Sequence, residues 1–343
     1  MMRRLFLSFL LMLLSFSALA ADVVLNPNHP QKHVVARGDT LWDISGMFLK
    51  FPWHWPDIWH VNPQIANPHL IYPGDILALV YRDGKPVLEL TRGPTAYKMS
   101  PEVRELALDK AIPTIPLDAI RPFLSRPNVV GAEVLDSAPY IVAGSEERLI
   151  SGAGDKVYVR QVDESEGRHY SVFRSGEVYS DPLTNETLGY EAIYTADAWL
   201  SVIAEISTAE LRETTREVLI GDRLLPAVDE LYEANFYPHL PESSFGGQII
   251  SVFDGVSQVG QYQVVVLNRG ERESLEVGHV VSIYQAGDVV RDIVSVDPKD
   301  VITLPDEYAG IALVFKTFEK VSYAIVMKAN RAIHINDRVS AAN

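Results

Sequence analysis

Four of the protein's five tryptophans stand close together near the N-terminal end, between two Gly-Asp pairs. The first pair opens the stretch GDTLWDIS at residues 38–45, and the second closes the stretch NPHLIYPGD at residues 67–75. A segment this short can bury little surface unless its side chains are large, and an aromatic residue buries about 150–250 Å². We therefore expect a small domain with a tryptophan-rich core. The tryptophans assigned to this core are Trp42, Trp55 and Trp59. Trp53 could instead be exposed and stack on a ligand such as a sugar ring.

Local signals within this segment predict two strands and two helices. A strand is expected at 33–35, before the Gly-Asp turn. Thr40 followed by Asp43 is typical of a capped helix start, and apolar residues then recur at helical spacing. The sequence Trp-Pro-Asp at 55–57 favours a second helix, because proline suits its first position and aspartate its positive end. A second strand is expected at 76–81. The predicted order is strand, helix, helix, strand.

These residues carry a strong resemblance to a known family. The patterns xVxxGDTLWxI, WxxIWxxNP and NPHxIYPGxxL occur in this order within residues 33–82, and that segment resembles a LysM domain. The resemblance implies binding of glycans that contain N-acetylglucosamine, chiefly peptidoglycan, in a groove between two loops. Carried over to this sequence, one loop supplies Gly38, Asp39, Thr40 and Leu41. The other loop supplies Leu70, Ile71, Tyr72, Pro73 and Gly74.

The residue types fit such a groove, although each also has a purely structural explanation. Backbone groups in turns can pair with acetamido groups, while apolar side chains cover the methyl groups. Gly38 and Gly74 could be glycine only because the turns require a positive φ. Asp39 and Asp75 could be ordinary turn residues.

The first twenty residues predict export. Arg3 and Arg4 precede an apolar run that ends in Ala-Leu-Ala, so residues 1–20 are typical of a signal peptide cleaved after Ala20. The alternative is an uncut membrane anchor, for which the apolar run is short. The chain has no cysteine, which excludes disulfides, a cysteine-linked lipid anchor and a cysteine nucleophile. We expect a periplasmic protein of a Gram-negative bacterium that is not a lipoprotein.

Charge argues against nucleic acid as a partner. The net charge of −15 becomes −17 when Arg3 and Arg4 are removed with the leader. Residues 131–343 hold 17 Lys+Arg against 34 Asp+Glu, so they carry essentially all of this charge. Such a surface repels phosphate backbones.

The remaining sequence divides by composition. Residues 21–32 predict a polar linker, and the proline-rich residues 83–130 predict a semi-rigid spacer. From residue 131 onward, short runs rich in Val, Ile and Tyr predict strands. The expected fold class is α+β, with a small βααβ domain followed by a mainly-β region. Within the β region, the stretch 172–192 predicts a hairpin, with a protein-contact loop as the alternative.

The β region also suggests a duplication, with modules at 131–238 and 245–343. Three pairs of segments match in the same order. They are 131–137 with 246–252, 151–159 with 275–283, and 216–224 with 331–339.

No signature of catalysis is present. The nine histidines include no His-x-His pair, and the four in residues 131–343 stand far apart, so we expect no metal site. Neither a nucleophile elbow nor a phosphate loop occurs. We expect no cofactor and no enzymatic activity. A wall-remodelling hydrolase stays as an alternative, because a glycosidase needs only two carboxylates.

The whole layout is similar to the type IV pilus secretin-associated LysM proteins. In that family the C-terminal part is similar to the C-terminal domain of the flagellar T-ring protein. The resemblance implies a peptidoglycan-associated adaptor near the outer membrane, whose protein partner is the secretin ring. A general envelope-integrity protein is the second alternative.

Overall fold

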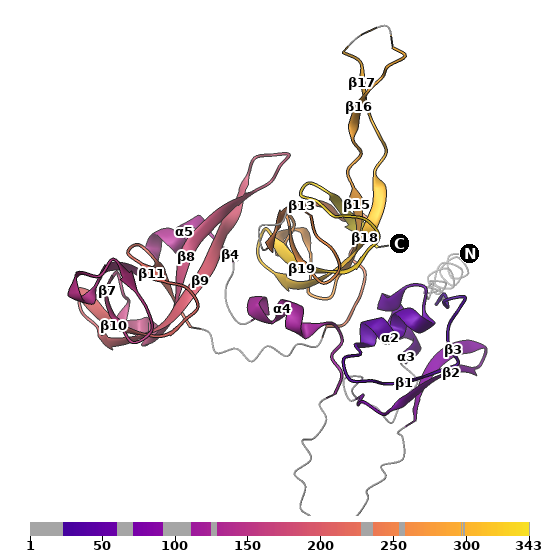
Figure 1. Cartoon of the computed structure of the whole chain (residues 1–343), viewed down its shortest axis with the longest axis horizontal. Helices are drawn as coiled ribbons and strands as arrows, with labels where there is room; N and C mark the ends of the chain where they lie inside the picture. Colours follow the sequence, from indigo (N-terminus) through magenta and orange to yellow (C-terminus); the bar gives the residue numbers. More distant parts are fainter. Residues whose placement is uncertain are drawn as a thin grey trace, which may run out of the picture. The chain divides into compact units, whose positions relative to one another are not determined.

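The computed structural model forms two compact units, Met1–Ile112 and Pro113–Asn343 (Figure 1). The residues that the structure describes are 23–59, 71–91, 111–124, 129–227, 236–253, 258–295, 297 and 299–342. The expected signal peptide at 1–20, Leu70, and residues 92–110 and 125–128 of the expected spacer lie outside these residues. Among the described helices, none combines the length and the apolar character needed to cross a membrane.

The first unit has the predicted order of elements, followed by one strand more. Its elements are β1 (Lys32–Val34), α2 (Leu41–Phe48), η1 (Pro52–His54), α3 (Trp55–Trp59), β2 (Ile76–Arg82) and β3 (Lys85–Thr91). The strands form one antiparallel sheet in the order β1-β2-β3. Helix α2 begins where predicted, because the Thr40 hydroxyl accepts the amide of Asp43 at 3.1 Å and donates to its carboxylate at 2.7 Å.

Strand β3 lies in the range that we expected to be spacer. Asp83 and Gly84 both have positive φ, at 50° and 78°, and form the tight turn that joins β2 to β3. Pro86 is tolerated because β3 is an edge strand. Leu88 is buried in the core of the unit. The prolines of this range suggested a spacer, but the Asp-Gly pair at 83–84 is typical of a hairpin turn and was overlooked.

The segment expected to be a linker is also part of the first unit. The amide of Asn26 donates to the Phe48 carbonyl at 2.9 Å, and that of Lys50 donates to the Val24 carbonyl at 2.9 Å. Val23 and Leu25 pack against the core. Residues 23–31 therefore cover the end of helix α2.

The tryptophan-rich core is confirmed, with one correction. Trp42, Trp55 and Trp59 are buried as predicted. Trp53, which could have been exposed, is only 4% exposed. Its ring lies 6.4 Å from that of Trp42 and 5.2 Å from that of Phe51, measured between centroids. Because it is enclosed by aromatic neighbours, Trp53 cannot stack on a sugar.

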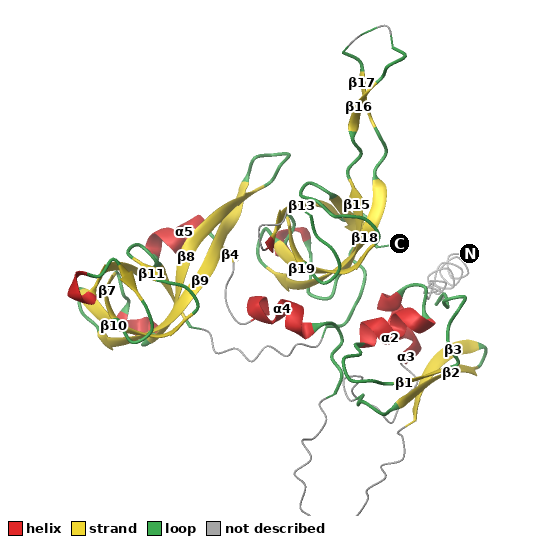
Figure 2. Cartoon of the chain, in the orientation of Figure 1, coloured by secondary structure: helices red, strands yellow, loops and turns green. Residues whose placement is uncertain are grey.

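The second unit is mainly β, and its first half is a sheet that closes on itself (Figure 2). The strand order is β10-β7-β5-β12-β8-β9-β4, and β9 also pairs with β10. The strands are β4 (Val129–Val130), β5 (Tyr140–Gly144), β7 (Lys156–Arg160), β8 (His169–Ser180), β9 (Thr187–Val202), β10 (Ile206–Thr214) and β12 (Arg223–Pro226). Two short strands, β6 (Ile150–Ser151) and β11 (Val218–Leu219), pair separately. Helix α4 (Leu117–Leu124) precedes the sheet, and α5 (Ala132–Ser137) follows β4.

The other half of the second unit is a closed barrel in the order β13-β14-β19-β18-β15-β20. Its strands are β13 (Gly246–Val252), β14 (Val264–Leu267), β15 (Val280–Gln285), β18 (Glu307–Thr317), β19 (Ser322–Ala329) and β20 (Arg338–Ala341). Between β15 and β18 the chain forms a two-stranded ribbon, β16 (Val289–Arg291) and β17 (Val301–Thr303), which projects from the barrel (Figure 1).

The proposed duplication is not confirmed. Segment 131–137 contains helix α5, whereas its partner segment 246–252 is strand β13. The strands that follow the other matched turns are β7 and β12 in one half, and β15 and β20 in the other. Strands β15 and β20 are neighbours, but β5 separates β7 from β12. The matched segments thus share a type of turn, but the strands around them are arranged differently in the two halves.

The β8–β9 hairpin, predicted from residues 172–192, reaches the barrel. At its tip, the carboxylate of Asp181 accepts the side-chain amide of Asn268 at 2.8 Å and the guanidinium of Arg269 at 3.1 Å. Glu186 pairs with Arg272 at 2.8 Å and with Lys320 at 2.9 Å. The hairpin contact is therefore made within the chain.

The boundary between the two β halves also differs from the expected one. The amide of His239 donates to the Gly278 carbonyl at 3.0 Å, and the amide of Val280 donates to the His239 carbonyl at 2.9 Å. Phe236 is buried. Residues 236–239 thus belong with the barrel.

Candidate functional site: two linked turns

The two loops implied by the sequence are two copies of one turn. In 36–39 the amide of Ala36 donates to the carboxylate of Asp39 at 2.9 Å, and the amide of Asp39 donates back to the Ala36 carbonyl at 3.2 Å. In 72–75 the amide of Tyr72 donates to the carboxylate of Asp75 at 3.0 Å, and the return bond is also 3.0 Å. The aspartates are thus needed to close the turns.

The third residue of each turn must be glycine for conformational reasons. Gly38 has a φ of 93° and Gly74 a φ of 96°, in the left-handed region that favours glycine. A Cβ on either residue would meet no atom within 4 Å. Both backbones therefore border open space, where a ligand can approach them.

Backbone hydrogen bonds join the two turns. The amide of Gly74 donates to the Val35 carbonyl at 2.8 Å, and the amide of Val35 donates to the Asp75 carbonyl at 2.8 Å. Val35 itself is buried. The structure thus brings together two segments that lie about 35 residues apart in the sequence, as the resemblance implied.

Three of the nine predicted site residues have structural roles. Thr40 is buried and caps helix α2 through its hydroxyl. Leu41 and Ile71 are buried members of the core. None of these three side chains is available to a ligand, because each is at most 3% exposed.

The accessible surface comes from five predicted residues. Gly38, Asp39, Tyr72, Pro73 and Gly74 are exposed or half-exposed. Asp39 is held by the His33 ring, whose Nε2 lies 2.8 Å from the carboxylate, in addition to its turn bond. The accessible part is therefore turn backbone flanked by one phenol and one proline ring. Such a surface suits neutral ligands that offer both hydroxyl edges and apolar faces.

Comparison with known proteins agrees with this geometry. Residues 33–79 match the model of the LysM domain family, so this segment is a LysM domain. LysM domains bind peptidoglycan and chitin-like glycans, which supports a glycan-binding role for the chain. No curated protein matches the chain.

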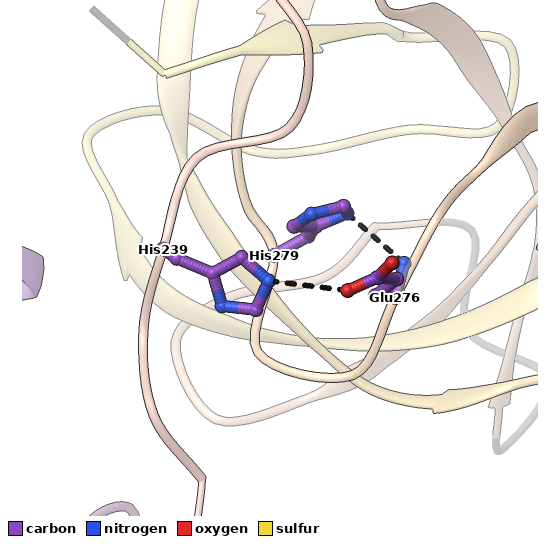
Figure 3. A group of neighbouring side chains, drawn as sticks. All are labelled: His239, Glu276 and His279. Atoms are coloured by element: carbon purple, nitrogen blue, oxygen red, sulfur yellow. Dashed lines mark hydrogen bonds and ion pairs between the residues drawn. The ribbon is translucent and has the colours of Figure 1, made fainter.

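A second constellation was missed by the sequence analysis. In the barrel, one potential ligand atom from each of His239, Glu276 and His279 lies within 4.8 Å of the others (Figure 3). The imidazole rings are 4.4 Å apart between centroids. Burial, together with the nearby His239, lowers the pKa of His279, which favours its neutral form. The two histidines are forty positions apart, so no local spacing signalled the cluster. Only the parallel pairing of residue 239 with residue 279 brings them together.

Proposed function

We propose that the protein is a non-catalytic periplasmic adaptor that holds an outer-membrane assembly to peptidoglycan. The observation that carries the proposal is the pair of linked turns, which offers accessible backbone with a tyrosine and a proline beside it. A single site of this kind binds weakly, with a Kd of about 1 μM to 1 mM, or about −8 to −4 kcal/mol. Several copies around a ring would gain avidity without new contacts.

The protein partner in this proposal is the type IV pilus secretin ring. Its support is the order of a leader, one LysM domain and an acidic β unit, which is similar to that of the secretin-associated LysM proteins. The β16–β17 ribbon supplies a contact surface of the right kind. Ile293 and Val294 at its tip are 88% and 86% exposed, and Val289 and Val301 on its strands are 65% and 57% exposed. Several exposed apolar side chains on one element are typical of interaction sites.

Co-sedimentation with purified sacculi tests the glycan part. The protein is compared with a variant lacking residues 23–112, which removes the described part of the first unit together with its edge strand β3, and the supernatant is analysed for released muropeptides. The adaptor predicts binding that disappears with the deletion, and no release. Release of muropeptides would favour the hydrolase instead. Binding that survives the deletion would place the glycan site outside the LysM domain.

Capture of the detergent-solubilised secretin ring tests the partner. We expect the protein to retain the ring, and a variant with Ile293→Ser and Val294→Ser to lose it while remaining folded. The exposed Leu183→Ser variant, at the tip of the β8–β9 hairpin, is the matched control. If the ring is not retained, a general envelope role without a pilus partner becomes the better account.

A further inference from the structure

We propose that His239, Glu276 and His279 form a binding site for a divalent transition metal, for which Zn²⁺ is the best fit. The set offers two imidazoles and one carboxylate, which are ligands that zinc accepts in proteins. Nε2 of His239 lies 3.7 Å from the Glu276 carboxylate. Ligand atoms on a tetrahedral zinc with bonds of about 2.0–2.1 Å are separated by about 3.4 Å. A small movement of the Glu276 side chain therefore completes this edge of the site.

The ring of His239 is already held in an orientation that suits a metal ligand. Its Nδ1 lies 2.9 Å from the Tyr237 carbonyl, which can only accept a hydrogen bond. Nδ1 therefore donates to this carbonyl, and Nε2 is the ring nitrogen that faces Glu276 (Figure 3). A ring nitrogen that donates to a carbonyl while the other faces the ligand set is the usual arrangement at a metal-bound histidine.

His279 occupies a position that other turns of this chain give to aspartate. The turn at 276–279 has the same bonds as the two LysM turns, because the amide of Glu276 donates to Nδ1 of His279 at 3.0 Å and the amide of His279 donates to the Glu276 carbonyl at 3.2 Å. The same turn is closed by aspartate at 36–39, 72–75, 152–155, 219–222 and 334–337. An aspartate would close the turn equally well, so turn formation alone does not account for a buried imidazole.

Gly278 permits the close approach of the two histidines. Its φ is 101°, and a Cβ at this position would lie 2.3 Å from the Tyr237 carbonyl oxygen and 3.0 Å from the His239 ring. The glycines of the LysM turns and of turns 152–155 and 219–222 face open space instead. Segment 236–239 is therefore seated directly on this turn.

When a metal binds, His279 would lose its hydrogen bond to the Glu276 amide and gain a bond to the metal. Nδ1 of His279 holds the Glu276 amide in the metal-free form, so His279 must release this amide when one of its ring nitrogens binds the metal. The metal would then fasten segment 236–239, which enters the barrel from the first β half, to the turn before β15. We infer a structural clip with one coordination position left to solvent.

Isothermal titration of the untagged, full-length protein with Zn²⁺ tests the proposal. We expect one Zn²⁺ per chain, and at least a tenfold weaker affinity in each of Glu276→Gln, His239→Gln and His279→Asn. The His279→Asn variant is the sharpest, because its side-chain oxygen can still accept the Glu276 amide and keep the turn closed. His169→Gln, in the other β half, is the matched control and should bind as the wild type does.

Thermal unfolding supplies an independent readout. Zn²⁺ should raise the Tm of the wild type and of His169→Gln but not that of the three site variants, since a ligand stabilises only the state that binds it. Ca²⁺, which prefers oxygen ligands, should have no effect. Absence of Zn²⁺ binding by the wild type would overturn the proposal, as would equal binding by all three site variants.

Discussion

Gly74 donates its amide to the carbonyl of Val35 at 2.8 Å, and this bond joins the two turns of the LysM domain. The turn at 36–39 follows Val35 directly, and Gly74 belongs to the turn at 72–75. A substitution that shifts one turn therefore strains or breaks the hydrogen bonds that hold it beside the other turn. The proposed glycan site therefore depends on backbone geometry more than on charged side chains.

Replacing Gly74 by alanine should weaken glycan binding and stability together. Its φ of 96° is unfavourable for alanine, although the new Cβ would meet no atom within 4 Å. We expect a loss of about 1–2 kcal/mol of unfolding free energy and a clear decrease in sacculus binding. Chemical unfolding and co-sedimentation measure the two effects.

The control for this substitution is Gly46→Ala in helix α2, where the Cβ would lie an ordinary 3.5 Å from Pro52. It should stabilise the domain by about 0.5–1 kcal/mol and leave binding unchanged. Equal effects of the two substitutions would contradict the role given to the turn.

Asp181 should hold the β8–β9 hairpin against the barrel. Its carboxylate is buried and accepts Asn268 and Arg269 from the barrel. We expect Asp181→Ala to cost about 3 kcal/mol of unfolding free energy, because Asn268 is left buried without this acceptor. Denaturant unfolding measures the loss, and the exposed Glu210→Ala on β10 should change stability by less than about 0.5 kcal/mol.

The unfolding free energy should also depend on pH through the carboxylate of Asp181. Burial alone would raise the pKa of Asp181, but the amides of Leu183 and Thr184, together with the two barrel residues, lower it to about 2. The stabilisation is thus complete above the ordinary pKa of 3.8 and is lost as the pH falls toward 2. If Asp181→Ala and the wild type lost stability in parallel between pH 5 and about pH 2, this carboxylate would not be the cause.

Lys316 should make the second unit more stable at alkaline pH. Burial lowers the pKa of its amine from 10.5 to about 8, while the amine donates to the Phe123 carbonyl of α4 at 2.7 Å. Between these two values the unfolded chain binds a proton that the folded chain has released, so the unfolding free energy rises with pH in that window. Below pH 8 the full cost of the buried charge is present.

Lys316→Met tests this reasoning. The substitution should raise the unfolding free energy at pH 7 by about 1–2 kcal/mol, as the removed charge outweighs the lost hydrogen bond. It should also flatten the pH dependence between pH 8 and 10. If the unfolding free energy of the wild type fell between pH 8 and 10, burial of the charged amine would not be destabilising.

The sequence predicted the elements that depend on local signals. The cap formed by Thr40 and Asp43, the tryptophan core and the two glycine turns were all recognisable from neighbouring residues. The prolines of the expected spacer hid strand β3, whose place is decided by pairing with β2. The exposure of Trp53 could not be predicted either, because it depends on Trp42 and Phe51 around it.

The second unit illustrates what local signals cannot provide. Matched Gly-Asp phrases suggested a duplication, yet a turn of this kind closes equally well wherever the chain reverses. Five aspartates and one histidine close six turns of the same kind at different places in the fold. The meeting of His239 with His279 depends on a parallel pairing that no local pattern encodes.

The most direct test of the glycan site compares Tyr72→Ala with Tyr81→Ala in binding to purified sacculi. Tyr72 begins the turn at 72–75, which is closed through its backbone amide, so the turn survives the loss of the side chain. Tyr81, on β2 of the same domain, is 63% exposed and takes no part in the two turns. We expect Tyr72→Ala to weaken binding about tenfold, or about 1.4 kcal/mol, and Tyr81→Ala to bind like the wild type. Equal binding by both variants, or a loss only with Tyr81→Ala, would contradict a glycan site between the turns.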